Sequence, residues 1–260
     1  MNLLKAEFLK LVYPRRTYGI LLAAIAIAVL GAAFTPYALS KMKNVVVMPL
    51  TDPATIDSDY SKALAGYIFA VIIGVLVVTS EFSHHTAIAT YLAAPKRYQP
   101  MIAKIIVAAI GGALLNLIAT LVAMASAAYA LSFYPDAVAP ASNVWLNFSM
   151  VALLTGAVLS LIGVGIGSLI RNQNAAVSVA FVWLFLIDRI LAVIFVDVGK
   201  YLPTGLVTSL MNLKVDVKGQ GLSINSADYL EPWPATGLLL AYGAVFVVAA
   251  LLTTNRRDID

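Results

Sequence analysis

Six long apolar stretches occupy most of this 260-residue chain and decide the solvent in which it folds. They lie at about residues 18–36, 63–80, 102–131, 145–170, 175–196 and 235–253. A helix needs about 20 mostly apolar residues to cross the hydrocarbon core of a bilayer, and each stretch is near or above that length. Because a segment in lipid must satisfy its own backbone hydrogen bonds, we expect six transmembrane helices. The sequence therefore predicts an all-α integral membrane protein with one transmembrane domain over residues 1–260.

The composition agrees with this class and excludes others. Hydrophobic residues make up 61% of the chain, charged residues make up 12%, and the mean hydropathy is +0.91. A soluble domain usually has about 25% charged residues. The longest connections, about residues 38–62 and 197–234, are too short for a nucleotide-binding domain. The pI of about 9.2 does not indicate nucleic acid, because the basic residues flank the spans and form no patch with interleaved aromatic residues.

The placement of Lys and Arg predicts the orientation of the chain. Arg15 and Arg16 precede the first span, and Lys96 and Arg97 lie in the short loop after the second. Short loops rich in Lys and Arg stay in the cytosol. Both termini are therefore expected to be cytosolic.

The N-terminal residues 1–16 are expected to form an amphipathic helix that lies in the membrane interface. Its basic residues suit anionic head groups, and Pro14 ends it. The alternative is a frayed basic tail. The apolar stripe of this helix follows helical spacing and consists of Leu4, Phe8, Leu11 and Val12.

Two further segments have a predicted structural role. Within about residues 197–234, leucines at helical spacing from Leu202 to Leu213 predict a short helix that dips into the outer leaflet. In the fourth span, Gly163 and Gly167 form a face of small residues on which another helix packs closely. A nucleotide-binding loop is excluded there, because no strand precedes these glycines.

The loop between the second and third spans carries the most specific pattern. Ser80 is expected to cap a new helix, with Glu81 in its first turn. Pro95 ends that helix, and Pro100 opens the next one in its first turn. The result is a short helix over about residues 82–95, tethered at both ends by spans. The alternative is an ordinary solvated connection without a partner.

At these residues the chain resembles the permease subunits of ABC exporters of the second type, the ABC-2 group. In that group the second span typically ends in a Glu followed five residues later by Thr. A coupling helix, a Pro-basic turn and a Lys that opens the third span come next. The matching residues here are Glu81, Thr86, Pro95, Arg97 and Lys104. The layout of N-terminal helix, six spans and short basic tail also matches, whereas His84 and His85 depart from the pattern.

This resemblance implies a permease subunit of an ATP-driven exporter in a bacterial cytoplasmic membrane. The cargo would be an amphipathic or hydrophobic compound, such as a peptide antibiotic, a drug or a lipid-like molecule. Its partners would be membrane lipid, two copies of a separate ABC ATPase that bind ATP and Mg, and a second permease, identical or related. The chain itself would bind no cofactor or metal and would not be an enzyme. Its contacts with the ATPase would involve Glu81, Phe82, Ser83, His84, His85, Thr86, Tyr91 and Arg97.

Four polar residues inside the spans are candidates for the transport pathway or its gate. Asp188 and Arg189 lie about 20 Å along the fifth span from Ala175, beyond its middle. Ionisable groups at such depth normally face protein or water. Three interpretations remain open for them: a structural ion pair or snorkelling Arg at the outer end, a direct contact with substrate, and a different placement of this span. Asn116 and Asn147 have the same ambiguity.

Two other functions remain as alternatives. One is a non-transporting immunity or scaffold subunit. The other is an intramembrane enzyme, which needs a nucleophile or a metal cluster within the spans. The only histidines, His84 and His85, lie in the predicted cytosolic loop and not within the spans. A metal site formed by these two histidines is not expected, because adjacent residues on a helix point about 100° apart and no third ligand lies nearby.

Overall fold

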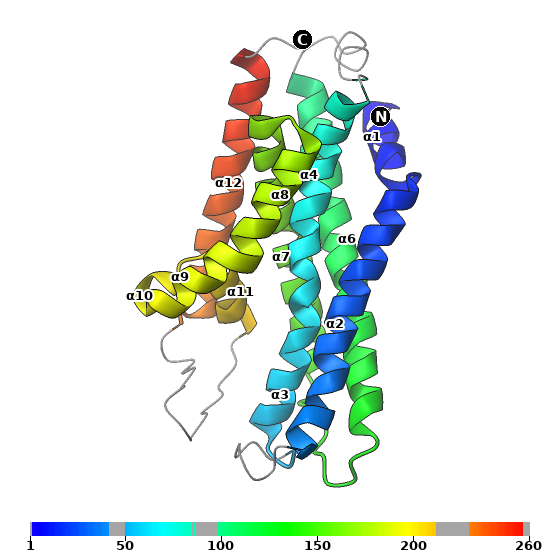
Figure 1. The fold of residues 1–260 in the computed structure, drawn as a ribbon, viewed down its shortest axis with the longest axis vertical. Helices are drawn as coiled ribbons and strands as arrows, with labels where there is room; N and C mark the ends of the chain where they lie inside the picture. The colour runs from blue at the N-terminus through cyan, green and yellow to red at the C-terminus, as the bar shows by residue number, and fades with distance from the viewer. Residues whose placement is uncertain (1, 42–49, 85, 87–97, 212–228, 257–260) are drawn as a thin grey trace.

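The computed structural model describes residues 2–41, 50–84, 86, 98–211 and 229–256 (Figure 1). All regular structure within these ranges is helical. Six helices are long and apolar enough to cross a membrane, which confirms the predicted class of an all-α protein with six candidate spans. These spans are Arg15–Ala38, Thr55–Ser83, Tyr98–Leu131, Val144–Ile170, Gln173–Ala192 and Pro232–Thr254.

The helices follow the chain in the order of the predicted segments. The first half contains α1 (Asn2–Val12), α2 (Arg15–Lys41), α3 (Pro53–Ser61), the 3₁₀ turn η1 (Lys62–Gly66) and α4 (Tyr67–Ser83). Two long helices follow, α6 (Tyr98–Leu131) and α7 (Val144–Ile170). The fifth span contains α8 (Gln173–Val182), the π-helical turn η2 (Trp183–Ile187) and α9 (Asp188–Ile194). The remaining helices are α10 (Val196–Gly199), α11 (Pro203–Met211) and α12 (Pro232–Arg256).

Helices α4 and α7 form the centre of the bundle. The apolar part of the span Thr55–Ser83, which contains α4, is 83% buried, compared with 17% for the span that contains α2 and 22% for the span that contains α12. Helix α7 packs against α4, α6 and α12. A Cβ atom on Gly163 of α7 would overlap the carbonyl oxygen of Val71, and one on Gly74 of α4 would overlap that of Ser160. The two helices are therefore in backbone contact, which only small residues permit.

Helix α1 is shorter than the helix predicted over residues 1–16, because it ends at Val12 and Arg15 already begins α2. Its apolar stripe also differs in part from the predicted one. Leu4, Phe8 and Val12 are exposed, as expected for residues that face lipid, whereas Leu11 is buried. The Leu11 side chain packs over Gly111 of α6, where the missing side chain leaves room for it. The hydroxyl of Thr17 donates to the carbonyl oxygen of Leu11 at 2.6 Å and closes the end of α1. Helix α1 is thus attached to the bundle by its C-terminal half.

The fifth span is not the continuous helix predicted over 175–196. The π-helical turn η2 interrupts it directly before Asp188, and α9 ends at Ile194. A π turn holds more residues than an α turn, so it changes which side chains face the bundle. The helix predicted in the following segment is present as α11, which packs on α12 through Leu206 and Leu210. Residues 212–228 of that segment lie outside the described ranges.

The start of α1, the end of α4, the start of α6 and the end of α12 lie at the same end of the bundle (Figure 1). This end is the predicted cytosolic one. Helices α9, α10 and α11 gather beside the bundle, on the side away from α2 and α6. The arrangement agrees with two termini on one side of the membrane, and the direction of the chain across the membrane stays a prediction.

Candidate functional site

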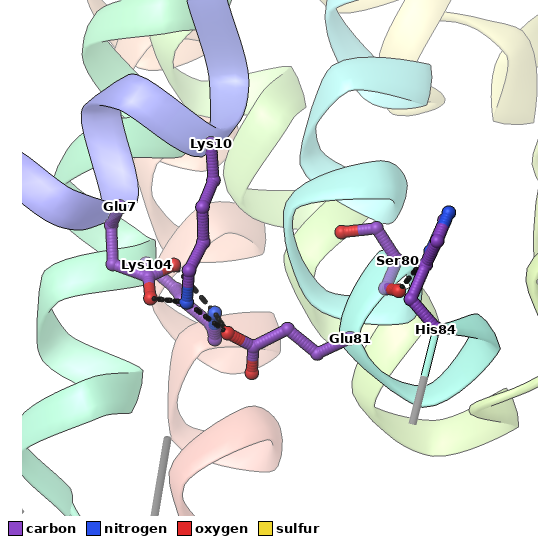
Figure 2. Close-up of polar contacts among 6 residues, drawn as sticks. All are labelled: Glu7, Lys10, Ser80, Glu81, His84 and Lys104. Atoms are coloured by element: carbon purple, nitrogen blue, oxygen red, sulfur yellow. Dashed lines mark hydrogen bonds and ion pairs between the residues drawn. The ribbon is translucent and has the colours of Figure 1, made fainter. Parts of the chain in front are cut away.

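Four charged side chains from three helices meet at the predicted cytosolic end (Figure 2). They are Glu7 and Lys10 of α1, Glu81 of α4 and Lys104 of α6. The Lys104 Nζ atom lies 2.5 Å from Glu7 Oε2 and 2.8 Å from Glu81 Oε1. The Lys10 Nζ atom lies 2.8 Å from Glu7 Oε1 and 2.6 Å from Glu81 Oε1. Each lysine therefore pairs with both glutamates, and we call this group the charge cluster.

Three of the four side chains in the charge cluster are buried. Glu7, Glu81 and Lys104 are each at most 3% exposed, whereas the Lys10 side chain is 44% exposed. Removing a charged group from water costs on the order of several kcal/mol, and only oppositely charged partners in good geometry offset this cost. Two positive and two negative groups balance here, so the cluster holds only while all three helices stay in place.

Lys10 is the member that solvent reaches. Burial alone would lower the pKa of Lys10, but hydrogen bonds to Glu7 and Glu81 and their negative charges raise it above 10.5. The contribution of Lys10 to stability is therefore fully present below pH 10.5 and is lost as the pH rises through the raised pKa. The cluster keeps this positive charge across the physiological range.

Glu81 does not begin a new helix, so the predicted cap at Ser80 is wrong. Helix α4 continues to Ser83, and the N–H of His84 donates to the carbonyl oxygen of Ser80 at 3.1 Å. A carboxylate in the last turn of a helix lies at the negative end of the helix dipole. Lys10 and Lys104 offset this unfavourable position. The two lysines therefore stabilise the Glu81 carboxylate, a role that the sequence analysis had assigned to the positive end of a new helix.

The five-residue spacing from Glu81 to Thr86 has a structural basis. The N–H of Thr86 donates to the carbonyl oxygen of Glu81 at 3.0 Å, which is the six-to-one bond of a Schellman-type helix end. Thr86 and His84 are exposed, and a ring nitrogen of His84, Nδ1, lies 2.7 Å from the Ser80 carbonyl oxygen. The chain thus turns out of α4 at these residues.

Much of the predicted coupling helix, about residues 82–95, lies outside the described ranges. Phe82 and Ser83 belong to the last turn of α4, and His85, Tyr91 and Arg97 are among the residues not described. Pro100 lies in the first turn of α6, as predicted. The charge cluster therefore lies at the two ends of this connection, one end on α4 and the other on α6.

Phe82 joins the end of α4 to the next turn at this end of the bundle. The Cζ atom of Arg171 lies 5.3 Å from the centroid of the Phe82 ring, within the range of a cation–π contact. Arg171 ends α7 with a φ of 55°, a conformation that favours glycine. An arginine in this position places a charged group over Phe82, which links α4 to the turn between α7 and α8.

Glu7 is the member of the cluster that the sequence analysis missed. It lies three residues before Lys10 and four before Leu11, so all three side chains lie on neighbouring parts of one helix surface. Glu7 is the only acidic residue among the first 50, in a segment that otherwise carries basic residues. That lone carboxylate was the available signal, but its partners on α4 and α6 could not be inferred from local spacing.

Asp188 and Arg189 point to different partners. Asp188 is fully buried, and its Oδ2 atom accepts the backbone N–H of Thr204 at 3.1 Å, in the first turn of α11. Arg189 is exposed, and its Nη2 atom lies 3.5 Å from the hydroxyl of Tyr67 on α4. Within the described ranges neither residue forms an ion pair. Asp188 thus caps α11, and Arg189 is available at the surface.

Replacing Asp188 tests the capping role. Asp188→Ala removes the acceptor of a helix-terminal N–H and should lower the free energy of unfolding by about 1–2 kcal/mol. Asp188→Asn keeps an acceptor oxygen, and because Asn and Asp cap helices about equally well, it should lose clearly less stability than Asp188→Ala. Thermal denaturation of the purified protein measures both. Equal losses for the two variants would show that the carboxylate charge matters more than the cap.

The other predicted residues separate into buried and exposed positions. Asn116 is buried, and its Nδ2 atom donates to the Ala152 carbonyl at 3.0 Å and to the Thr155 hydroxyl at 3.1 Å. It joins α6 to α7 inside the bundle. Asn147 is exposed in the first turn of α7. The structure therefore does not bring these two amides together.

The charge cluster has a mechanical character. Its lysines and glutamates neutralise one another, so none is available as a free base or nucleophile. Among the residues that the structure describes, no group of three or more His, Cys, Asp or Glu side chains could hold a metal ion. A cavity of about 20 Å³, room for one water, adjoins the cluster between α1, α2 and α4. The arrangement can hold α1, α4 and α6 together or release them together.

Comparison of the sequence with models of known protein families and with curated proteins gives no match.

Proposed function

We propose that this multi-pass helical membrane protein is the membrane-spanning subunit of an ATP-driven exporter. The observation that carries the proposal is the charge cluster. It joins α1 to the end of α4 and the start of α6, the two helices that flank the predicted coupling segment. In the ABC-2 pattern these are the elements on which a soluble ATPase acts.

A force on the coupling segment has a direct route into the bundle. Residues 84–97 connect the last turn of α4 to the first turn of α6. Glu81 and Lys104 pair with each other, and both pair with α1, so a partner that displaces the segment moves three helices as a unit. The exposed side chains of His84 and Thr86 at the start of the segment are suited to contact such a partner.

The movement of α4 would continue to the opposite end of the bundle. Helices α4 and α7 are in backbone contact at Gly74 and Gly163, so they cannot slide independently without separating. Helix α7 packs on α12, which in turn holds α11. Close-packed helices of this kind transmit displacement because protein interiors compress little. The helices beside the outer half of the bundle are therefore the expected site of opening.

The energy would come from a second protein. Two copies of a separate ATPase would bind ATP and Mg and close against the coupling segment, and a second permease would complete the pathway. The cargo would be an amphipathic or hydrophobic compound that leaves the cytosol or the inner leaflet. The chain would act in a bacterial cytoplasmic membrane as a transport subunit and not as an enzyme.

Co-purification tests this assembly. The tagged protein, extracted from native membranes, should bring with it a soluble ATPase that contains a phosphate-binding loop, identified by mass spectrometry. The reconstituted complex should hydrolyse ATP faster when its cargo is present. If no ATPase associates, the exporter proposal is wrong. An ATPase that associates but shows no cargo-dependent hydrolysis would favour a non-transporting immunity or scaffold subunit.

Glu81→Ala tests the mechanical route in that complex. Cargo-stimulated ATP hydrolysis should fall by about fivefold or more, as expected when a coupling free energy of about 1–3 kcal/mol is lost. Membrane insertion should persist, because the substitution makes the end of the span Thr55–Ser83 more apolar. Glu231→Ala is the matched control, since it removes an exposed carboxylate at the far end of α12 and should leave hydrolysis unchanged. Equal hydrolysis in parent and Glu81→Ala would exclude Glu81 from the coupling route.

A further inference from the structure

The guanidinium of Arg189 is exposed within a candidate membrane span. The residue lies in the span Gln173–Ala192 and is exposed on the surface of the chain. In the part of the chain that the structure describes, its hydrogen bond is to the Tyr67 hydroxyl, at a long 3.5 Å, and it has no ion pair. A charged group at membrane depth is costly unless protein, water or a partner charge receives it. Arg189 therefore requires a partner.

The neighbouring carboxylate does not supply that partner. Asp188 is fully buried and uses Oδ2 to cap α11 through the N–H of Thr204. The positive end of the α11 dipole offsets the charge of Asp188. Asp188 and Arg189 therefore do not neutralise each other by a direct ion pair, and the guanidinium keeps most of its five donors available.

Arg189 lies where two helices diverge. Helix α8 packs against α4, whereas α9 packs against α11, and in Figure 1 the fifth span slants away from α4 along its length. The Arg189 side chain reaches back from α9 to Tyr67 at the start of α4. Tyr67 lies 16 residues before Ser83, the end of α4, or about 24 Å along the helix. With Ser83 at the predicted cytosolic boundary of a hydrocarbon core of about 30 Å, this position would lie in the outer third of that core.

The surface around Arg189 is apolar. Phe185, Leu186 and Ile190 are 38%, 55% and 46% exposed, and the rings of Phe181 and Phe185 stack with centroids 4.4 Å apart. An isolated cation within an apolar surface is complementary to a molecule that joins an anionic group to an apolar body. Lipid alone would cover the apolar residues, but acyl chains leave the guanidinium without a hydrogen-bond partner.

We propose that Arg189, together with the Tyr67 hydroxyl, binds the anionic head group of an amphipathic molecule from the outer leaflet. The planar guanidinium would hold a phosphate or carboxylate through two parallel hydrogen bonds. The Tyr67 hydroxyl would add a third donor from α4. The apolar body would lie along Phe185 and Ile190. The ligand is either a resident anionic phospholipid or a transported anionic amphipath, and in the second case the inference rests on the proposed exporter function.

Native mass spectrometry of the full-length protein in detergent measures this binding without ATP or an ATPase. One arm compares phosphatidylglycerol with phosphatidylcholine, and the other compares dodecyl phosphate with dodecylphosphocholine. The parent protein should prefer the anionic member of a pair by about tenfold, the lower end of what a hydrogen bond to a charged group contributes. A preference in the phospholipid arm alone identifies a resident lipid, and a preference in the alkyl arm as well identifies a site open to single-chain cargo.

Variants assign the preference to Arg189. Arg189→Gln should remove it, and Arg189→Lys should keep only part of it, because a lysine retains charge but loses the fork of donors. Lys200→Gln is the matched control, since it removes a cation from the adjacent α10–α11 turn and should leave the preference intact. If Arg189→Gln does not fold, Arg189→Lys and Tyr67→Phe provide the test, because each should reduce the preference for the anionic probe in part.

Two results would overturn the proposal. One is a folded Arg189→Gln variant that binds the anionic probes as tightly as the parent. The other is a change in the dimer population of that variant with lipid affinity unchanged, which would assign Arg189 to a contact between copies of the chain. Because no ATPase takes part, failure of this binding is distinct from failure of the exporter proposal.

Discussion

Lys104→Met should lower the free energy of unfolding by about 3–5 kcal/mol, the cost of leaving buried charges without a partner. Lys104 is 1% exposed, and its ammonium group lies within 2.8 Å of both Glu7 and Glu81. Methionine preserves much of the volume but removes the charge. Two buried carboxylates would then share the single ammonium of Lys10. Thermal denaturation of the purified protein, followed by the fraction that remains monodisperse, measures the loss.

Lys10→Met is the matched control for this prediction. It removes the same charge from the same two glutamates, but from a side chain that is 44% exposed. Because solvent screens such a group, the loss should be about 1 kcal/mol or less. Adding Glu81→Gln to Lys104→Met restores the charge balance and should recover part of the stability. If Lys104→Met costs no more than Lys10→Met, the buried pairs do not stabilise the bundle.

Gly163→Ala should lower the free energy of unfolding by about 3 kcal/mol or more, at or above the usual range for overpacking. The added Cβ would overlap the backbone carbonyl oxygen of Val71 on α4. A backbone atom cannot move aside as the tip of a flexible side chain can, so α4 and α7 must separate. The same denaturation measurement detects this loss. In the proposed exporter complex, cargo-stimulated ATP hydrolysis should fall with it.

Alanine at two other glycines provides the control for this prediction. A Cβ atom on Gly19 of α2 or Gly237 of α12 would meet nothing within 4 Å. Alanine is also the better helix former by about 1 kcal/mol, so Gly19→Ala and Gly237→Ala should be neutral or slightly stabilising. A similar loss at all three positions would show that backbone conformation, and not the α4–α7 contact, sets the cost.

Part of the candidate site could be predicted from local sequence. The spacing of Glu81 and Thr86 is a backbone feature, because the N–H of Thr86 bonds to the carbonyl oxygen of Glu81 as the helix ends. The Pro100 position in the first turn of α6 follows from the missing N–H of proline. Such features depend on residues a few positions apart, which a single sequence displays directly.

Other predictions failed because distant contacts outweighed local preference. Ser80 and Glu81 resemble a helix start, but in the structure they end α4, and two lysines from other helices compensate the charge of Glu81. The fifth span reads as continuous, but η2 interrupts it where Asp188 meets the N-terminus of α11. Lys104 and α11 lie outside the local segments around Glu81 and Asp188, so the local pattern did not show that they would contact these residues.

The sequence by itself determined that this protein is a bundle of membrane-spanning helices. Hydrocarbon offers no hydrogen-bond partners to the backbone, so a long apolar segment forms a helix, in which the backbone groups bond to one another. Only the tertiary structure decided which charges meet. Glu7 lies 97 residues from Lys104, and Lys10 lies 71 residues from Glu81. Their pairing depends on how α1, α4 and α6 pack, since paired and buried positions are set by the whole bundle and not by the spacing along any one helix.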